Sequence, residues 1–99
     1  MSPMIRLNVL REDEQEERIF QGADVRVGRS RDCDLAFRED RMLSRFHCRI
    51  RLVDGHCEIE DLSSRNGIQV NGRFLRQGVL EVGDEVQLGG VRLELIGFG

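Results

Sequence analysis

The chain has 99 residues, which suffices for one two-layer domain but not for a second hydrophobic core. Its charged fraction is 33%, its net charge is −3, and it contains no Lys, Thr, Trp or Tyr. This acidic balance argues against a general attraction to nucleic acid or to acidic membranes, and no apolar stretch is long enough to span a bilayer or resembles a signal peptide. We expect a single domain over residues 1–99, with a core from about 5 to 96 and no cofactor.

Short apolar runs with a period of two follow one another along the chain, and Gly, Asn and Asp separate them. This pattern predicts β-strands, because alternate side chains of a strand share one face. We expect strands at 5–9, 19–20, 23–27, 34–37, 48–53, 56–61, 68–70, 74–75, 80–82, 86–88 and 91–96, with an acidic loop at 12–17. No segment has helical periodicity. The predicted fold class is all-β, an antiparallel-rich β-sandwich of about ten or eleven strands.

Asp54 and Gly55 form a strong two-residue turn signal that sets the register of one hairpin. The predicted pairs are Val53–His56, Leu52–Cys57, Arg51–Glu58, Ile50–Ile59, Arg49–Glu60 and Cys48–Asp61. One face is then apolar, and the other carries opposite charges on facing residues.

The three cysteines, Cys33, Cys48 and Cys57, form an odd and scattered set. Small secreted domains carry even disulfide frameworks, so this set indicates a reducing cytoplasm. In the predicted hairpin Cys48 and Cys57 lie ~13 Å apart along the strands, too far for a disulfide. His47 and His56 precede them, but neighbouring strand residues point to opposite faces. We expect buried structural thiols and no metal site.

Three polar turns carry the remaining chemistry, at 28–29, 44–47 and 64–67. Arg29 and Arg45 supply guanidinium groups, Ser44 a hydroxyl and Asn66 an amide. This set of donors suits an oxyanion, above all a phosphate. Ser44 also lies three residues before His47, as in some hydrolases. However, no nucleophile elbow and no acid to orient the histidine accompany them, so we expect no catalytic residue and no enzyme activity.

The motifs in these turns resemble the signature of the forkhead-associated (FHA) domain. They are Gly28-Arg29, Ser44-Arg45-x-His47, Asp61-Leu62-Ser63-Ser64-x-Asn66-Gly67 and Val70-Asn71-Gly72, in that order. The resemblance extends from about Ile5 to Ile96. It implies an eleven-strand sandwich of the FHA/SMAD-like kind, with loops at one end that bind phosphothreonine peptides.

The resemblance also implies roles for individual residues. Arg29 and Ser44 would contact the phosphate, Arg45 would add a second phosphate contact, and Asn66 would hold the peptide main chain. The architecture of the site would depend on Gly28, His47, Ser64, Gly67, Asn71 and Gly72, with the imidazole of His47 tying neighbouring loops together. At position 65 the family often has Thr or Ser, whereas this chain has Arg65. We therefore count Arg65 among the binding residues and expect it to favour acidic residues near the phosphothreonine.

Three functions remain open at this stage. The first is a module that recognises phosphothreonine on partner proteins in a bacterial serine/threonine kinase pathway. The second is an FHA-like scaffold that binds an unphosphorylated partner through a sheet face or edge. The third is a nucleic-acid binder that uses its arginines, against which the net acidity counts.

Overall fold

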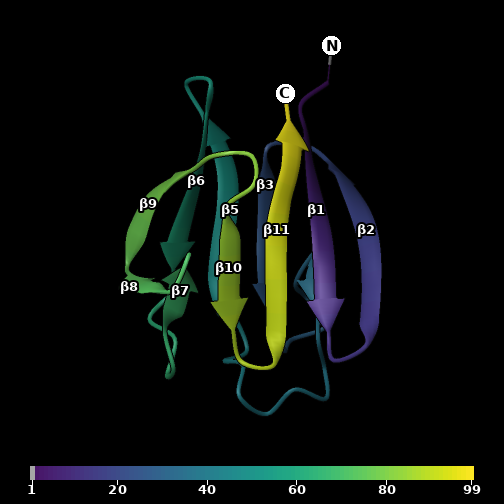
Figure 1. Ribbon diagram of the computed structural model, residues 1–99, viewed down its shortest axis with the longest axis vertical. Helices are drawn as coiled ribbons and strands as arrows, with labels where there is room; N and C mark the ends of the chain where they lie inside the picture. The colour runs from purple at the N-terminus through teal and green to yellow at the C-terminus, as the bar shows by residue number, and fades with distance from the viewer. Residues whose placement is uncertain (1) are drawn as a thin grey trace.

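The structure is a computed structural model that describes residues 2–99, and in it eleven strands form two packed sheets (Figure 1). The six-stranded sheet has the order β2-β1-β11-β10-β7-β8, and the five-stranded sheet has the order β4-β3-β5-β6-β9. The strands are β1 (Met4–Arg11), β2 (Glu14–Gln21), β3 (Asp24–Gly28), β4 (Leu35–Ala36), β5 (Cys48–Val53), β6 (His56–Asp61), β7 (Ile68–Val70), β8 (Arg73–Leu75), β9 (Gln77–Leu80), β10 (Glu85–Leu88) and β11 (Val91–Phe98). The all-β prediction is confirmed. Across residues 2–99 there is no helix long and apolar enough to cross a membrane.

The core lies between the sheets and consists of the inward-facing members of each alternating strand. β1 contributes Ile5, Leu7 and Val9, and the neighbouring β11 contributes Val91, Leu93 and Leu95, all of which are buried. The facing sheet supplies a matching apolar layer from β3, β5 and β6. Burying such side chains contributes about 1.5–3 kcal/mol each, and this makes the core the main stabilising feature of the fold.

The hairpin of β5 and β6 has the predicted register at all six residue pairs. Cys48 and Cys57 are buried and free, as is Cys33. Burial raises the pKa of the Cys57 thiol to about 11, and it raises the pKa of Cys48 as well. These thiols are therefore protonated core side chains at neutral pH.

The residues of the two predicted charge pairs on the outer face, Arg51–Glu58 and Arg49–Glu60, lie opposite each other, but neither pair forms an ion pair within residues 2–99. Arg49 lies opposite Glu60, but its ion-pair partner is Asp24 of β3. The Nε of Arg49 donates to both carboxylate oxygens of Asp24, at 2.9 and 3.0 Å. Because β5 lies between β3 and β6, the guanidinium reaches either neighbour, and it forms the forked bond with the aspartate. This bond lowers the pKa of Asp24, with partial burial acting in the opposite direction.

Most predicted strands lie within two residues of the observed bounds, but two predicted segments differ by more. The acidic stretch at 12–17 is a loop only at residues 12–13, and Glu14 to Glu17 belong to β2. β2 is an edge strand whose exposed charges suit solvent, and its backbone pairs with β1. The strand expected at 80–82 lies earlier, at Gln77–Leu80, because residues 82–83 form a turn in which Gly83 has a φ of 98°.

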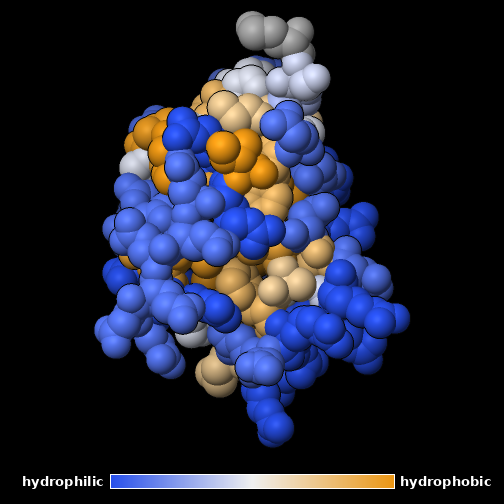
Figure 2. Space-filling model, turned by 90° about the vertical axis from the view of Figure 1, so that its right-hand side faces the viewer, coloured by the Kyte–Doolittle hydropathy of each residue, from blue (hydrophilic) through white to orange (hydrophobic). Residues whose placement is uncertain are grey.

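The side of the sandwich at β2 is open between the two sheets. Figure 2 shows this side as a band of apolar atoms between two hydrophilic flanks. A small hollow there, of about 140 Å³, has Val9, Leu35 and Phe37 among its lining residues and charged side chains of β2 on its rim. Arg11 lies 5.3 Å from the centre of the Phe37 ring, so a cation covers part of this apolar surface.

The loops after β3, β4 and β6 all extend from the same end of the sandwich, at the bottom of Figure 1. The start of β1 and the last residue, Gly99, lie at the opposite end, where Met4 and Gly99 exchange backbone hydrogen bonds. The strand directions therefore bring the three polar turns of the sequence to one end.

Candidate functional site

The first and second polar turns lie directly against each other. The backbone N–H of Arg29 donates to the carbonyl of Ser44, and that of Ser30 donates to the carbonyl of Arg45, each at 3.0 Å. A Cβ atom on Gly28 would lie 2.2 Å from the carbonyl oxygen of Arg45. No real Cβ contact is that short, so only glycine allows the two backbones to approach this closely.

His47 connects the second and third turns through its buried side chain. It directly precedes β5 and is 0% exposed. Its Nδ1 accepts a hydrogen bond from the N–H of Ser44 at 3.1 Å, and its Nε2 lies 2.7 Å from the carbonyl oxygen of Gly67. Because Nδ1 is the acceptor, the partners assign the proton to Nε2, which donates to Gly67. The imidazole therefore acts as a neutral bridge between two loops.

Two more hydrogen bonds connect the loop at 64–67 with the preceding loop. The Oγ of Ser44 accepts from the backbone N–H of Arg65 at 2.9 Å, which leaves the hydroxyl proton of Ser44 free for another acceptor. The side-chain amide of Asn66 donates to the carbonyl of Met42 at 2.9 Å. These bonds orient the hydroxyl and the amide at the loop surface.

Ser64 stabilises the third turn from within. Its hydroxyl forms a short hydrogen bond with the carboxylate of Asp61 and accepts from the N–H of Gly67 at 2.9 Å. Gly67 has a φ of 76°, which favours glycine. Asp61 belongs to the sequence motif of this turn, and the structure shows why: its carboxylate anchors the serine.

Sequence reasoning missed a contribution of Cys33 to this end of the molecule. The Sγ of Cys33 donates a weak hydrogen bond to the carbonyl of Arg45 at 3.3 Å. Burial, followed by the nearby charge of Asp34, raises the pKa of this thiol, so it is a protonated donor at neutral pH. A lone cysteine in a loop gives no sequence signal for such a contact.

The arginines at this end are not neutralised by protein carboxylates. Arg29 is half-buried, whereas Arg45 and Arg65 are exposed. In the described part of the chain, residues 2–99, the arginines that form ion pairs are all on strands: Arg6, Arg11, Arg18, Arg49 and Arg92. The loops therefore combine three free guanidinium groups with an available hydroxyl and an oriented amide, a set of donors suited to a phosphate.

Asn71 and Gly72 lie outside this cluster. They form the turn between β7 and β8, where Asn71 has a φ of 50°. The side chain of Asn71 donates to Asp84 and accepts from the N–H of Glu85, each at 3.0 Å. These contacts thus stabilise the start of β10. Asn71 is connected to the three polar turns only through β7.

These features define the class of the protein. The sequence profile of the FHA domain matches residues 25–89, and the chain belongs to this family. The matched segment contains all three polar turns. Known relatives and solved structures extend the likeness beyond the profile.

The chain is 42% identical over 67 residues to the glycogen accumulation regulator GarA of Mycolicibacterium smegmatis. That alignment covers 68% of this chain and 42% of GarA. In general the chain spans less than half the length of the curated relatives it matches.

Among solved structures, the FHA domain of the CT664 protein of Chlamydia trachomatis superposes with a TM-score of 0.84 at 30% identity, and the match covers 97% of this chain and 99% of that domain. A structure described in work on phosphothreonine-dependent FHA domain interactions has a TM-score of 0.77 at 26% identity, covering 98% of this chain and 97% of that one.

Proposed function

We propose that this domain binds phosphothreonine-containing segments of partner proteins in serine/threonine kinase signalling and catalyses no reaction itself. The observation that carries the proposal is a group of polar side chains on loops at one end of the sandwich: Arg29, Ser44, Arg45, Arg65 and Asn66. Within residues 2–99, none of these three arginines forms an ion pair.

Each of these residues has a distinct task in the proposal. Arg29 is half-buried, so it offers its guanidinium fork to the phosphate with less competition from water than an exposed arginine. Ser44 donates its free hydroxyl proton to a second phosphate oxygen. Arg45 and Arg65, both exposed, add charge at the rim. Asn66, whose amide is already oriented by Met42, holds the main chain of the peptide.

The relatives support this function. GarA is named as a regulator and other relatives as inhibitors of oxoglutarate dehydrogenase, names that suit a binding module better than an enzyme. The related domain studied for phosphothreonine-dependent interactions matches this chain over almost its full length. The three free thiols accord with a reducing compartment, so we propose that the domain acts in the cytoplasm.

Calorimetry with a matched pair of peptides, one carrying phosphothreonine and one unphosphorylated, tests the proposal. We expect a Kd near 1 μM for the phosphopeptide, about −8 kcal/mol, and weaker binding of a phosphoserine version. Arg29→Ala should cost at least ~2 kcal/mol, because a partly desolvated phosphate loses its forked partner. Arg92→Ala is the control, since Arg92 lies on β11 in an exposed ion pair and should leave the affinity unchanged.

Equal affinity for the two peptides would reject the phosphate-dependent function and favour the scaffold function in its place. Tight binding of DNA that weakens steeply with added salt would favour the nucleic-acid function instead.

A further inference from the structure

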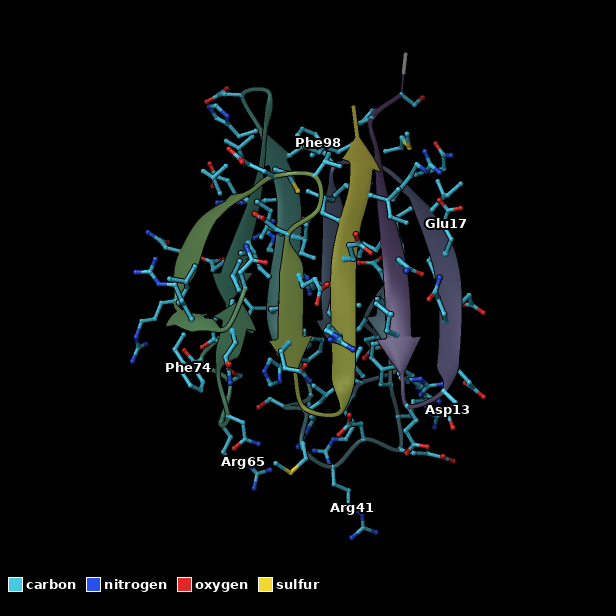
Figure 3. The ribbon with its side chains drawn as sticks, viewed as in Figure 1. Asp13, Glu17, Arg41, Arg65, Phe74 and Phe98 are labelled. Carbon is cyan, nitrogen blue, oxygen red and sulfur yellow. The ribbon has the colours of Figure 1, made fainter. Side chains whose placement is uncertain are left out.

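The strand β2 forms the longest open sheet edge in the described part of the chain, residues 2–99. It has eight residues and pairs with β1 on one side only, whereas β4, at the same side of the facing sheet, has two residues. Such an edge presents backbone N–H and C=O groups with which a further strand can pair. Figure 3 shows Glu17 and Asp13 on this side and Arg65 at the opposite lower corner, so the edge lies away from the third polar turn.

The small hollow between the two sheets lies directly beside this edge. Its volume of about 140 Å³ is close to the ~150 Å³ of a cavity that holds a benzene ring, so it has room for one side chain. Val9, Leu35 and Phe37 are among its lining residues. In the register with β1, Glu16 lies opposite the buried Val9, so Glu16 and its second neighbours along β2 face this side. A strand added to β2 would likewise direct every second side chain over the hollow.

Arg11 shows how a basic side chain fits at this hollow. Its guanidinium carbon lies 5.3 Å from the centre of the Phe37 ring, and one of its nitrogens lies 3.7 Å from a carboxylate oxygen of Glu14. The face of the ring attracts the cation, and the carboxylate supplies an opposite charge. The side chain of Glu14 is 80% exposed, so it stays accessible to a second cation.

Arg18 repeats this arrangement further along the strand. Its guanidinium carbon lies 5.4 Å from the centre of the Phe20 ring, and one of its nitrogens lies 3.5 Å from a carboxylate oxygen of Glu16. The side chain of Glu16 is 68% exposed. Glu14 and Glu16 are two residues apart and therefore point to the same face of β2. The edge thus offers two accessible carboxylates at the spacing of alternate residues in a partner strand.

The charge of this edge determines which kind of strand suits it. Five of the six residues at 12–17 are acidic. Like charges on facing residues destabilise a pair of strands, and opposite charges stabilise it. A second copy of this chain would bring the same carboxylates to the edge, whereas a basic strand would face them with opposite charge. The edge is therefore unsuited to pairing with itself and complementary to a basic segment.

We propose that β2 is a second docking site, which binds an extended basic segment of a partner protein by strand addition and without a phosphate. Backbone hydrogen bonds along the free edge hold the segment. Alternate Lys or Arg side chains lie over the hollow, with their aliphatic stems on its apolar lining and their charges at Glu14 and Glu16. The site is independent of the proposed phosphothreonine function, because it uses the edge of the sheet and none of the three polar turns.

NMR titration of the isotope-labelled domain with a synthetic peptide tests the site. The peptide has eight residues in which lysine alternates with valine, and a matched peptide has glutamate in place of lysine. We expect the lysine peptide to shift the amide signals of β2 and to leave those of Arg29 and Ser44 unchanged, and the glutamate peptide to shift neither. N-methylation of two adjacent central residues of the lysine peptide should weaken its binding at least ~5-fold, because one N–H that faces β2 is lost.

The double variant Glu14→Gln/Glu16→Gln should bind the lysine peptide about 5-fold more weakly, as the loss of two exposed charge pairs predicts. Glu58→Gln/Glu60→Gln is the matched control, because it makes the same change of charge on β6 of the other sheet. This control should bind the peptide as the wild type does, and melting curves should show that both variants are folded. Addition of the phosphothreonine peptide should leave the affinity for the lysine peptide unchanged.

Equal weakening in the two double variants would show a general attraction to an acidic protein and overturn the proposal. Undiminished binding of the N-methylated peptide would exclude strand addition. A titration without shifts in β2, or with shifts in the polar turns instead, would also reject the site. Self-association of the wild type that Glu14→Gln/Glu16→Gln alters, measured by sedimentation, would assign the edge to a second copy of this chain and overturn the inference.

Discussion

Replacement of His47 by alanine should destabilise the domain strongly, because this side chain is the buried bridge between the second and third turns. It accepts from Ser44 and donates to Gly67, and it is 0% exposed. His56, the other histidine, lies exposed at the start of β6 and provides a matched control.

The magnitude follows from the two hydrogen bonds. Each contributes about 1 kcal/mol net, and a buried group left without its partner costs about 1–3 kcal/mol more. The imidazole also leaves a cavity. Since Ser44 and Gly67 are half-buried and water reaches them in part, we expect a loss of about 3 kcal/mol. Domains of this size are stable by about 5–15 kcal/mol and lose about 4–8 °C in Tm per kcal/mol, so the Tm should fall by about 12–24 °C.

Thermal and urea unfolding of His47→Ala, His56→Ala and the wild type measure this effect. His56→Ala should remain within about 0.5 kcal/mol of the wild type. Phosphopeptide binding by His47→Ala should weaken as a consequence of disordered loops. An unchanged melting curve would refute the bridging role, and complete loss of binding with that unchanged curve would show that His47 contacts the ligand directly.

Two further predictions concern the backbone contact and the thiols. Gly28→Ala should cost about 1–3 kcal/mol and weaken phosphopeptide binding, since the new methyl group displaces the carbonyl of Arg45. Gly97→Ala should be nearly neutral in unfolding experiments, because a Cβ there would make only an ordinary contact with the Cδ of Arg6 at 4.0 Å. The free energy of unfolding should fall as the pH rises from the ordinary thiol pKa of 9.0 through about 11, because the raised pKa of Cys57 means that the folded state holds its proton longer than the unfolded state. The chain has no Lys or Tyr, so thiols are the side chains that titrate in this window. As the pH rises, the urea midpoint should decline less in Cys57→Ala than in the wild type. An equal decline in the two proteins would contradict the assignment of this pH effect to Cys57.

Local pattern determined much of the fold. The alternation of apolar and polar residues predicted the sheets, and the turn at Asp54 and Gly55 determined the hairpin register at every pair. The period of two failed along Glu14–Gln21, where the strand pairs with β1 through its backbone and through ion pairs of Glu14 and Glu17, and where both faces of its first half are exposed to solvent. An edge strand of this kind carries no apolar signal.

The sequence by itself determined which residues are available to bind a phosphate, because the side-chain chemistry of Arg29, Ser44 and Asn66 and their order along the chain require no structure. Only the tertiary structure decided that their turns meet. That meeting depends on the absence of a Cβ at Gly28, which would lie 2.2 Å from the carbonyl oxygen of Arg45, and on the buried imidazole of His47 between two loops. The contacts of Gly28 with Arg45 and of His47 with Gly67 join residues distant in sequence, and no local pattern encodes them.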